Sequence, residues 1–234
     1  MMDGYYGLGY AIPIWIAFLA TKPVSPVAAI LLLMTSLHGC RLGWYLSKRW
    51  FGYRKTTGGD PRYLGFVTKF SQGYWWKSFF MVMEPQAIVI AVIGLPAVWG
   101  VLGNHDAGSL NWLSYLGMLV FGIGYYFETV ADGQLQAFKA DANNKERYLR
   151  TGVWLHSRHP NYFGNAAVWW GIWLVAMSGN HDLWWTVAGP IFNTIMLTGI
   201  LGSAIQDKYM GARPEYKKVM VETSRFLPLA RKQK

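Results

Sequence analysis

The chain has 234 residues, of which 53% are hydrophobic, 17% aromatic and only 15% charged. This composition excludes an ordinary soluble domain, in which about a quarter of the residues are charged. A single cysteine, Cys40, excludes an internal disulfide and a cysteine-based metal cluster, and no metal site is expected. The sequence therefore predicts an all-α integral membrane protein that forms one domain over residues 1–234.

Apolar runs recur along the chain at about the length of a helix that crosses a bilayer, roughly 20 residues. Six such runs predict six transmembrane helices, at residues 5–20, 24–46, 78–102, 110–131, 161–177 and 183–205. The first run is short and contains Pro13. Pro85 is expected to kink the third helix or to mark its true start.

The net charge of +10 would favour a nucleic-acid partner in a soluble protein, but the distribution of the charge indicates otherwise. All basic residues except Lys22 and Arg41 fall in residues 48–77, 139–158 and 208–234, each after an even-numbered predicted helix. Six helices place these three stretches on one face of the membrane. By the positive-inside rule both termini then face the cytoplasm, or the matrix or stroma of an organelle, and we expect no nucleic-acid partner.

Four residues on the second predicted helix are spaced by three, four and four positions: His38, Arg41, Tyr45 and Arg49. This spacing places them on one helical face. An arginine in a membrane segment is costly unless it meets an anion or a water-filled cavity, so Arg41 is a candidate functional residue. The glycine-containing loop at residues 56–62 suits either a phosphorylated ligand or an ordinary lipid-facing loop.

A polar stripe leaves the membrane along the fourth predicted helix: Glu128, Asp132, Gln136 and Lys139. Side-chain pairing within the helix would explain this stripe without any function. Two carboxylates at the same end of the bundle as Arg41 and His159 also favour a ligand site, and the spacing leaves both explanations open.

Functional side chains cluster just before the fifth predicted helix: Ser157, Arg158, His159, Asn161 and Tyr162. Pro160 lies among them and is expected in the first turn of that helix, because proline has a fixed φ and no N–H. A helix N-terminus with Arg158 and His159 beside it suits a phosphate or a carboxylate. An interfacial loop whose basic side chains reach lipid headgroups has the same composition, and the spacing favours neither.

The stretch after the sixth predicted helix predicts an amphipathic helix near residues 213–223, over the site or on the membrane surface. Lys208 and Tyr216 in this stretch are candidate ligand contacts. The chain has no P-loop, no GxGxxG after a strand, no GxSxG and no HExxH, so a nucleotide would bind by a route other than a Rossmann fold.

Four segments resemble, in order, the DUF1295 branch of the steroid 5-alpha-reductase superfamily: RLGWYLSKRWFGYRKTTGGDPRY at 41–63, ADGQLQAFK at 131–139, LHSRHPNYFGNAAVWWG at 155–171 and ARPEYKKVMVETSRFLPL at 212–229. The opening DGYYGLGY is also similar to that branch. Characterised reductases of the superfamily are multi-helix membrane proteins that use NADPH to saturate the carbon–carbon double bond of a lipid or steroid enone. The resemblance therefore implies NADPH as cofactor and a lipid or steroid-like substrate.

Matched position by position, the resemblance implies cofactor contacts at Arg41, Tyr45, Arg49, Asp132, Lys139, Asn161, Lys208 and Tyr216, with His156 and Asn165 nearby. Arg158, His159 and Tyr162 of the same motif complete the candidate cofactor site. The reaction needs a cofactor held against the lipid and a donor that polarises the enone carbonyl. In the reductases this donor pair resembles a glutamate and a tyrosine, and Asp3 and His38 occupy roughly those positions as candidate catalytic residues.

Departures from the family pattern keep other functions open: Asn165 replaces a usual carboxylate, His38 replaces the expected tyrosine, and Asp3 is shorter than the expected glutamate. A non-catalytic or lipid-binding subunit of a larger membrane complex would keep the fold without the reaction. An S-adenosylmethionine-dependent methyltransferase is a further alternative. It rests on Arg158-His159-Pro160 and Arg213-Pro214-Glu215-Tyr216, which resemble segments of the isoprenylcysteine methyltransferases.

Overall fold

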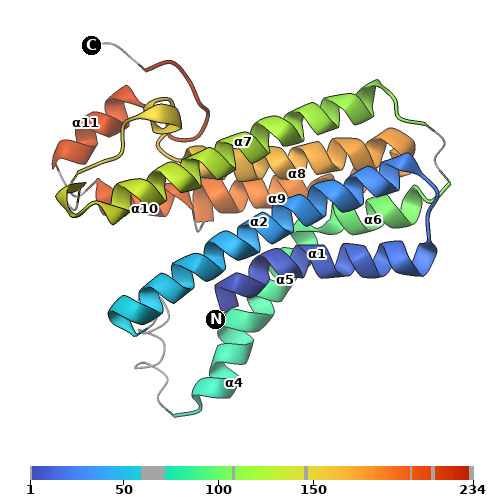
Figure 1. The fold of residues 1–234 in the computed structure, drawn as a ribbon, viewed down its shortest axis with the longest axis horizontal. Coiled ribbons are helices and arrows are strands. Elements are labelled where there is room, and N and C mark those ends of the chain that lie inside the picture. Colours follow the sequence, from blue (N-terminus) through green and yellow to red (C-terminus); the bar gives the residue numbers. More distant parts are fainter. Residues whose placement is uncertain are drawn as a thin grey trace. The chain divides into compact units, whose positions relative to one another are not determined.

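The computed structural model describes residues 2–58, 72–106, 109–144, 147–200, 202–211 and 214–231. Over these residues the chain is helical with connecting loops, and its isolated backbone bridge joins Ser157 to Ser224 (Figure 1). The chain divides into two compact units. Unit 1 contains Met1–Ser114 and Val175–Gly189, and unit 2 contains Tyr115–Leu174 and Pro190–Lys234.

Unit 1 is built around the close pair of α1 (Met2–Thr21) and α2 (Pro26–Thr57). The two helices approach through glycines, and a Cβ atom on Gly7 would collide with the backbone of Gly39 and Gly43. Such small residues allow helix backbones to approach closely where lipid supplies no hydrophobic drive. The glycines of the first two predicted helices therefore fix the packing of this pair.

The boundaries of α2 follow from local chemistry. Ser25 Oγ accepts a hydrogen bond from the Ala28 N–H at 3.4 Å, and Pro26 occupies the first turn. At the other end Gly58 adopts a left-handed conformation with φ of 76°, which ends the helix. The helix thus continues past the predicted end at residue 46, as a single rod that carries His38, Arg41, Tyr45 and Arg49 on one face.

The structure divides the predicted third helix into four pieces: α4 (Tyr74–Ser78), the π-helix η1 (Phe79–Met83), α5 (Glu84–Ile93) and α6 (Leu95–Gly103). Pro85 lies in the first turn of α5, where the π-helix η1 changes to α-helix, inside a helical stretch that continues from Trp76 to Ile93. It therefore does not mark the start of the helix. A break does occur at Gly94, with Pro96 in the first turn of α6, and no prediction placed it there. Both irregularities lie where proline cannot donate a backbone hydrogen bond.

Buried hydrogen bonds join the ends of helices in unit 1. Asn104 Nδ2 donates to Gly100 O at 2.7 Å and to Ala176 O at 3.0 Å. Ser114 in α7 (Trp112–Ala140) donates its hydroxyl to Ser178 in α8 (Pro160–Gly179) at 2.8 Å. The 3₁₀ segment η4 (His181–Val187) completes the unit. These bonds satisfy polar groups that burial would otherwise leave costly.

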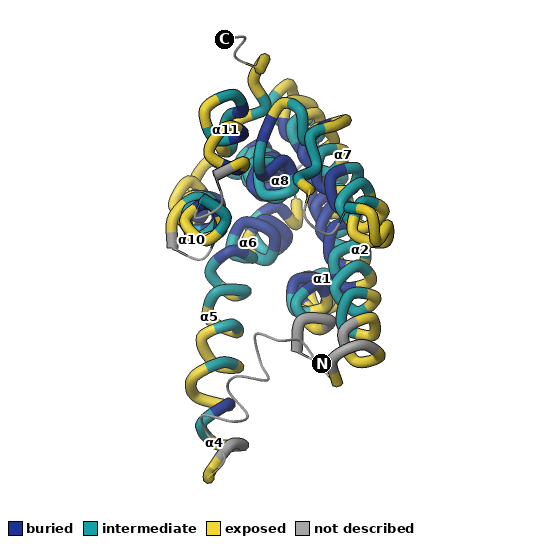
Figure 2. Tube along the Cα trace, turned by 90° about the vertical axis from the view of Figure 1, so that its left-hand side faces the viewer, coloured by how far each residue is buried: buried dark blue, intermediate teal, exposed yellow. Residues whose placement is uncertain are grey.

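Unit 2 is organised on the pair α7 and α8, which also meet through glycines. A Cβ atom on Gly164 would collide with Gly124 O and the Glu128 backbone, and one on Gly171 with Phe121. Much of α8 is consequently buried (Figure 2), and the Trp169 side chain is among the largest that are fully buried. This close approach brings the polar side chains of α7 and α8 within hydrogen-bonding distance.

Around this pair lie two short 3₁₀ turns and four further helical segments: η2 (Ala142–Asn144), η3 (Gly152–Leu155), α9 (Ala188–Ile195), the π-helix η5 (Met196–Ile200), α10 (Ser203–Met210) and α11 (Pro214–Glu222). Helix α11 confirms the helix predicted near residues 213–223, and its buried Tyr216 and Val219 confirm its amphipathic character.

Among the described residues, four helical stretches are long and apolar enough to cross a membrane: Pro26–Gly52, Trp76–Ile93, Trp112–Ala140 and His181–Met210. Tyr5–Thr21 is apolar but shorter. An all-helical fold with helices of membrane-spanning length is therefore confirmed. The count of six spans and the sidedness of the termini stay predictions.

Candidate functional site

The start of α8 has the form that the sequence predicts. Helix α8 begins at Pro160, and the preceding Ser157 Oγ accepts a hydrogen bond from the His159 N–H at 3.1 Å. Tyr162 N–H donates to His159 O at 3.1 Å and opens the first turn. Arg158 and His159 are thus held in a rigid turn at the end of a helix.

Both basic side chains of this turn meet a buried carboxylate, Asp207 on α10. Arg158 donates from Nη2 to Asp207 Oδ2 at 2.6 Å and from Nε to Oδ1 at 3.3 Å. His159 Nε2 lies 3.1 Å from the same Oδ1, and since an ionised carboxylate only accepts, Nε2 carries the proton. The Asp207 residue is only 5% exposed. Asp207 was not among the residues predicted from the sequence.

The Asp207 carboxylate and Arg158 also hold α11. Tyr216 donates its hydroxyl proton to Asp207 Oδ1 at 2.8 Å. Burial raises the pKa of Tyr216 above its ordinary value, and the hydrogen bond to Asp207 raises it further. Arg158 Nη1 donates to Met220 O and Thr223 O, both at 2.7 Å, and so satisfies carbonyls at the end of α11. One buried network therefore joins α8, α10 and α11.

The segment after α11 is fastened along the same turn. Arg158 N–H donates to Ser224 O at 2.8 Å, Ser157 Oγ donates to Phe226 O at 2.9 Å, and Leu229 N–H donates to His156 O at 3.1 Å. Glu222 accepts hydrogen bonds from Arg231 and Arg150, which hold the pKa of its carboxyl below the ordinary value. The C-terminal residues to Arg231 are thus an integral part of unit 2.

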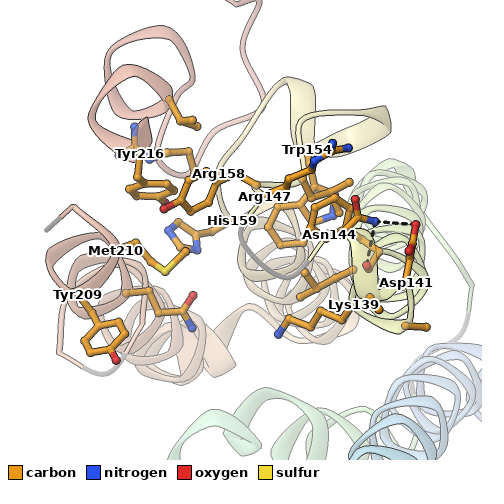
Figure 3. Close-up of a pocket in the computed structure, with 18 of the residues that line it drawn as sticks. Lys139, Asp141, Asn144, Arg147, Trp154, Arg158, His159, Tyr209, Met210 and Tyr216 are labelled. Carbon is orange, nitrogen blue, oxygen red and sulfur yellow. Dashed lines mark hydrogen bonds between the residues drawn. The ribbon is translucent and has the colours of Figure 1, made fainter. Parts of the chain in front are cut away.

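A cavity of about 960 Å³ lies beside this network, entirely within unit 2. Its walls come from the end of α7, the loop before η3, the turn before α8, and helices α10 and α11. Lys139, Arg147 and Trp154 lie on one side, Tyr209 and Met210 on the opposite side, and Arg158 and His159 between them (Figure 3). Ligand pockets in proteins commonly have volumes of about 300–1,000 Å³, so this one is suited to a large ligand.

The cavity combines cationic and aromatic groups. Arg158 and His159 contact Asp207, and Lys139 and Arg147 add further positive charge to the wall. The Tyr148 and Tyr216 rings lie 5.0 Å apart, and Trp154 Nε1 donates to Ala131 O at 3.1 Å, which fixes the indole. Such walls can bind an anion and a planar ring together. In the sequence, Arg147 counts only among the basic residues that indicate membrane sidedness. Tyr148 and Trp154 have no distinguishing sequence feature.

Deeper in unit 2, the carboxylates of the α7 stripe are paired with amides of α8. Asn161 Nδ2 donates to Asp132 Oδ1 at 3.1 Å, and one turn on, Asn165 Nδ2 donates to Glu128 Oε1 at 3.0 Å. Asn193 on α9 extends the series, with its Nδ2 donating to Asn165 Oδ1 at 3.0 Å. Each carboxylate orients its amide, because only Nδ2 can donate to it. We call these five residues the carboxamide ladder.

Residues 1–223 match the model of a family described as a protein of unknown function (DUF1295). The chain belongs to this family. No curated protein and no solved structure matches it. The part of this DUF1295 chain that matches contains the Asp207 network, all the residues of the carboxamide ladder and the walls of the cavity.

In this DUF1295 chain, the predicted cofactor residues of unit 2 fall into four groups. Lys139, Arg158, His159 and Tyr216 line the cavity. Asp132, Asn161 and Asn165 belong to the carboxamide ladder. Tyr162 stacks on His159, with ring centroids 5.4 Å apart, and its hydroxyl accepts from Gln206 at 2.6 Å. His156 and Lys208 are exposed and are not among the cavity-lining residues.

The other predicted residues of the DUF1295 chain lie in unit 1. His38 is fully buried, with its ring 6.2 Å from that of Tyr10. The Arg41 guanidinium lies 5.6 Å from the Tyr45 ring centroid, within range of a cation–π contact. Arg49 follows on the same face of α2. Asp3 is in the first turn of α1, but its side chain lies outside the described part of the chain, as does most of the loop at residues 56–62.

Proposed function

We propose that this DUF1295 protein is a multi-pass membrane protein with six transmembrane helices and both termini on its basic face. Its four long apolar helices and the shorter apolar α1 support membrane insertion. The placement of the basic stretches supports the sidedness, because cytoplasmic loops carry an excess of Lys and Arg. The membrane would be a bacterial inner membrane or an organelle membrane.

Its proposed activity is the NADPH-dependent reduction of the carbon–carbon double bond of a steroid-like or other lipid enone, as a member of the steroid 5-alpha-reductase superfamily. The observation that carries this proposal is the cavity of about 960 Å³ with its basic and aromatic walls. The segments that resemble the reductases contribute part of these walls, including Lys139, Arg158 and Tyr216. A dinucleotide phosphate needs this combination of cations and flat apolar surfaces.

The residues of the cavity fit such a cofactor in separate ways. Lys139 and Arg147 would bind phosphate oxygens, and Tyr148 and Trp154 would contact planar rings. Arg158 would hold the cavity wall in place rather than bind a phosphate, since its charge is already balanced by Asp207. When bound, NADPH supplies the hydride that the β-carbon of the enone receives.

The proposed reaction also needs a donor to the enone carbonyl, and His38 and Asp3 stay the predicted donors. A buried histidine such as His38 can hold a proton at one ring nitrogen and polarise a carbonyl oxygen that approaches it. The amide at Asn165 suits the packing of this chain, because it donates to Glu128, whereas a second carboxylate 3.0 Å from Glu128 would repel it.

Titration of detergent-purified protein with NADPH, followed by nicotinamide fluorescence, tests the proposal. We expect saturable binding that weakens as salt is added, because the phosphate contacts are ionic. Absence of binding would overturn the reductase assignment. Displacement of bound nucleotide by S-adenosylmethionine, with methyl transfer and no NADPH oxidation, would instead support the methyltransferase alternative.

A second candidate function is that of a non-catalytic subunit in a larger membrane complex. The stretch Trp76–Ile93 of unit 1 favours it, since little of this stretch is buried and Trp76, Phe79 and Phe80 are exposed. An apolar helix face of this kind can contact another protein as well as lipid. Stoichiometric co-purification with a membrane complex, without NADPH binding or turnover, would support this function over the reductase.

A further inference from the structure

The chain after α11 bends at residues 225–227 and lies against the rest of unit 2 on one side. Ser224, Phe226 and Pro228 are partly buried, and the Ser224 and Phe226 carbonyls accept hydrogen bonds from the turn before α8. The Phe226 ring also lies 6.0 Å from that of Phe163. Arg225, Leu227 and Leu229, which lie between and after these residues, are exposed.

Helix α11 continues the same outward pattern. Its buried face contains Tyr216 and Val219, while Lys217, Lys218 and Val221 are exposed. Together with three exposed residues of the segment after α11 they form a surface that we call the strap face: Lys217, Lys218, Val221, Arg225, Leu227 and Leu229. Leu227 and Leu229 are 52% and 55% exposed, although hydrogen bonds hold the backbone of their segment in place.

The acidic groups near the strap face do not cancel its charge. Within the described residues 214–231 the carboxylates are Glu215, at the start of α11, and Glu222, which is bonded to Arg150 and Arg231. Lys217, Lys218 and Arg225 therefore leave the face cationic. The face combines positive charge with three aliphatic side chains, and its backbone is already held in place by the hydrogen bonds to the turn before α8.

We propose that the strap face docks on the surface of a membrane that contains anionic phospholipid. Leucines and a valine flanked by cations match the boundary between acyl chains and charged headgroups. Juxtamembrane lysines and arginines are attracted to anionic leaflets, and the attraction is lost at high salt. A protein partner is less well matched, because stable interfaces need a larger apolar centre with aromatic anchors than these three side chains provide.

This inference depends on the membrane placement but not on the reductase chemistry. Failure of the protein to reconstitute into lipid discs would contradict membrane insertion. A protein that reconstitutes but whose strap face stays in water would contradict only the docking. Likewise, a protein that docks but binds no NADPH would leave the inference intact.

The test places an environment-sensitive fluorophore at residue 227, as Leu227→Cys in a Cys40→Ser background. The labelled full chain is reconstituted in discs of phosphatidylcholine alone or with phosphatidylglycerol. Quenching by aqueous iodide and by nitroxide on the lipid reports where the label lies. We expect phosphatidylglycerol to lower iodide quenching and raise nitroxide quenching, and high salt to reverse both changes.

The charge requirement is tested with the double variant Lys217→Gln/Arg225→Gln, whose side chains make no described contact on which the fold depends. Each neutralised cation should lower the docked-to-free ratio by about fivefold. The matched variant Lys22→Gln/Lys55→Gln removes two exposed cations of unit 1 and should leave the ratio unchanged.

Equal iodide quenching in both lipids would overturn the proposal. An unchanged docked-to-free ratio in the Lys217→Gln/Arg225→Gln variant would also overturn it. A label that is protected in native membranes but open to iodide in both kinds of disc would also overturn it, because a protein would then cover the face.

Discussion

The Arg158 guanidinium and the Asp207 carboxylate form a buried, bidentate ion pair, 2.6 Å from Nη2 to Oδ2 and 3.3 Å from Nε to Oδ1. The third guanidinium nitrogen of Arg158, Nη1, donates hydrogen bonds to the carbonyls of Met220 and Thr223. The arginine of the RHPNY motif is thereby the point at which α8, α10 and α11 are joined. Its position on the cavity wall makes the stability of unit 2 and the shape of the cavity depend on the same contact.

We expect Asp207→Leu to destabilise the protein by about 3–5 kcal/mol, because it leaves the Arg158 charge buried without a counterion. The free energy of unfolding, measured by chemical denaturation in detergent micelles, checks this. The double variant Arg158→Leu/Asp207→Leu should lose less than the sum of the single losses, since it removes both charges.

Asp141→Leu is the matched control for Asp207, because Asp141 also lines the cavity but is exposed. Its loss should cost less than about 1 kcal/mol. If Asp207→Leu is no worse than Asp141→Leu, the buried pair does not stabilise unit 2.

Tyr216→Phe should remove the hydroxyl donor to Asp207 without changing the ring, at a cost of about 1.5–3 kcal/mol for a hydrogen bond to a charged group. The difference should depend on pH. The pKa of Tyr216 is raised in the folded protein, so its stabilising contribution is complete below the unfolded pKa of about 10 and decreases as the pH rises above it. Unfolding measured from about pH 7 to about pH 11 should show the wild-type advantage shrink.

Tyr209→Phe provides the control for that experiment, since Tyr209 also lines the cavity and is 78% exposed. This variant should match the wild type in stability throughout the neutral range. A Tyr216→Phe protein as stable as Tyr209→Phe at neutral pH would show that the hydroxyl bond to Asp207 contributes nothing.

Local chemistry explains which features could be predicted from sequence. Pro160 begins α8 because proline fixes φ and lacks the N–H that the first turn does not use. The apolar period of residues 214–222 is enough to predict α11 and its buried side. Four cavity residues are also among the predicted cofactor contacts. Arg158 and His159 follow from the chemistry of a helix N-terminus, and Lys139 and Tyr216 from the resemblance to the reductases.

Tertiary contacts explain what could not be predicted. Asp207 is 49 positions from Arg158, and in sequence it is only an acid beside Lys208. An arginine that binds a ligand and one that binds a buried aspartate have the same local sequence. Trp154 lines the cavity because its indole bonds to Ala131 on α7, a contact that depends on how the loop folds. The break at Gly94 likewise interrupts a run that is apolar throughout.

Asn165→Asp should destabilise the protein, because it replaces the donor to Glu128 with a second carboxylate at a distance of about 3 Å, where like charges repel strongly. We expect a loss of about 2–4 kcal/mol. The free energy of unfolding, measured by chemical denaturation in detergent micelles, checks this. Asn143→Asp, at an exposed position, should not show this loss, and an Asn165→Asp protein that behaves like it would contradict the role of the carboxamide ladder.

Lys139→Gln and Arg147→Gln should each weaken NADPH binding by about tenfold to a hundredfold, as expected for loss of a charge-assisted contact of about 1.5–3 kcal/mol. Both side chains line the cavity opposite Tyr209, and Arg158 cannot replace them while it is paired with Asp207. Fluorescence titration at two salt concentrations measures the effect. Each variant should also show a smaller loss of affinity at high salt than the wild type, because one ionic contact fewer is screened.

Lys218→Gln removes an exposed cation of α11 that is not among the cavity-lining residues and should leave the Kd unchanged. If Lys139→Gln and Arg147→Gln bind NADPH as tightly as Lys218→Gln does, the cofactor phosphates are not held at this wall.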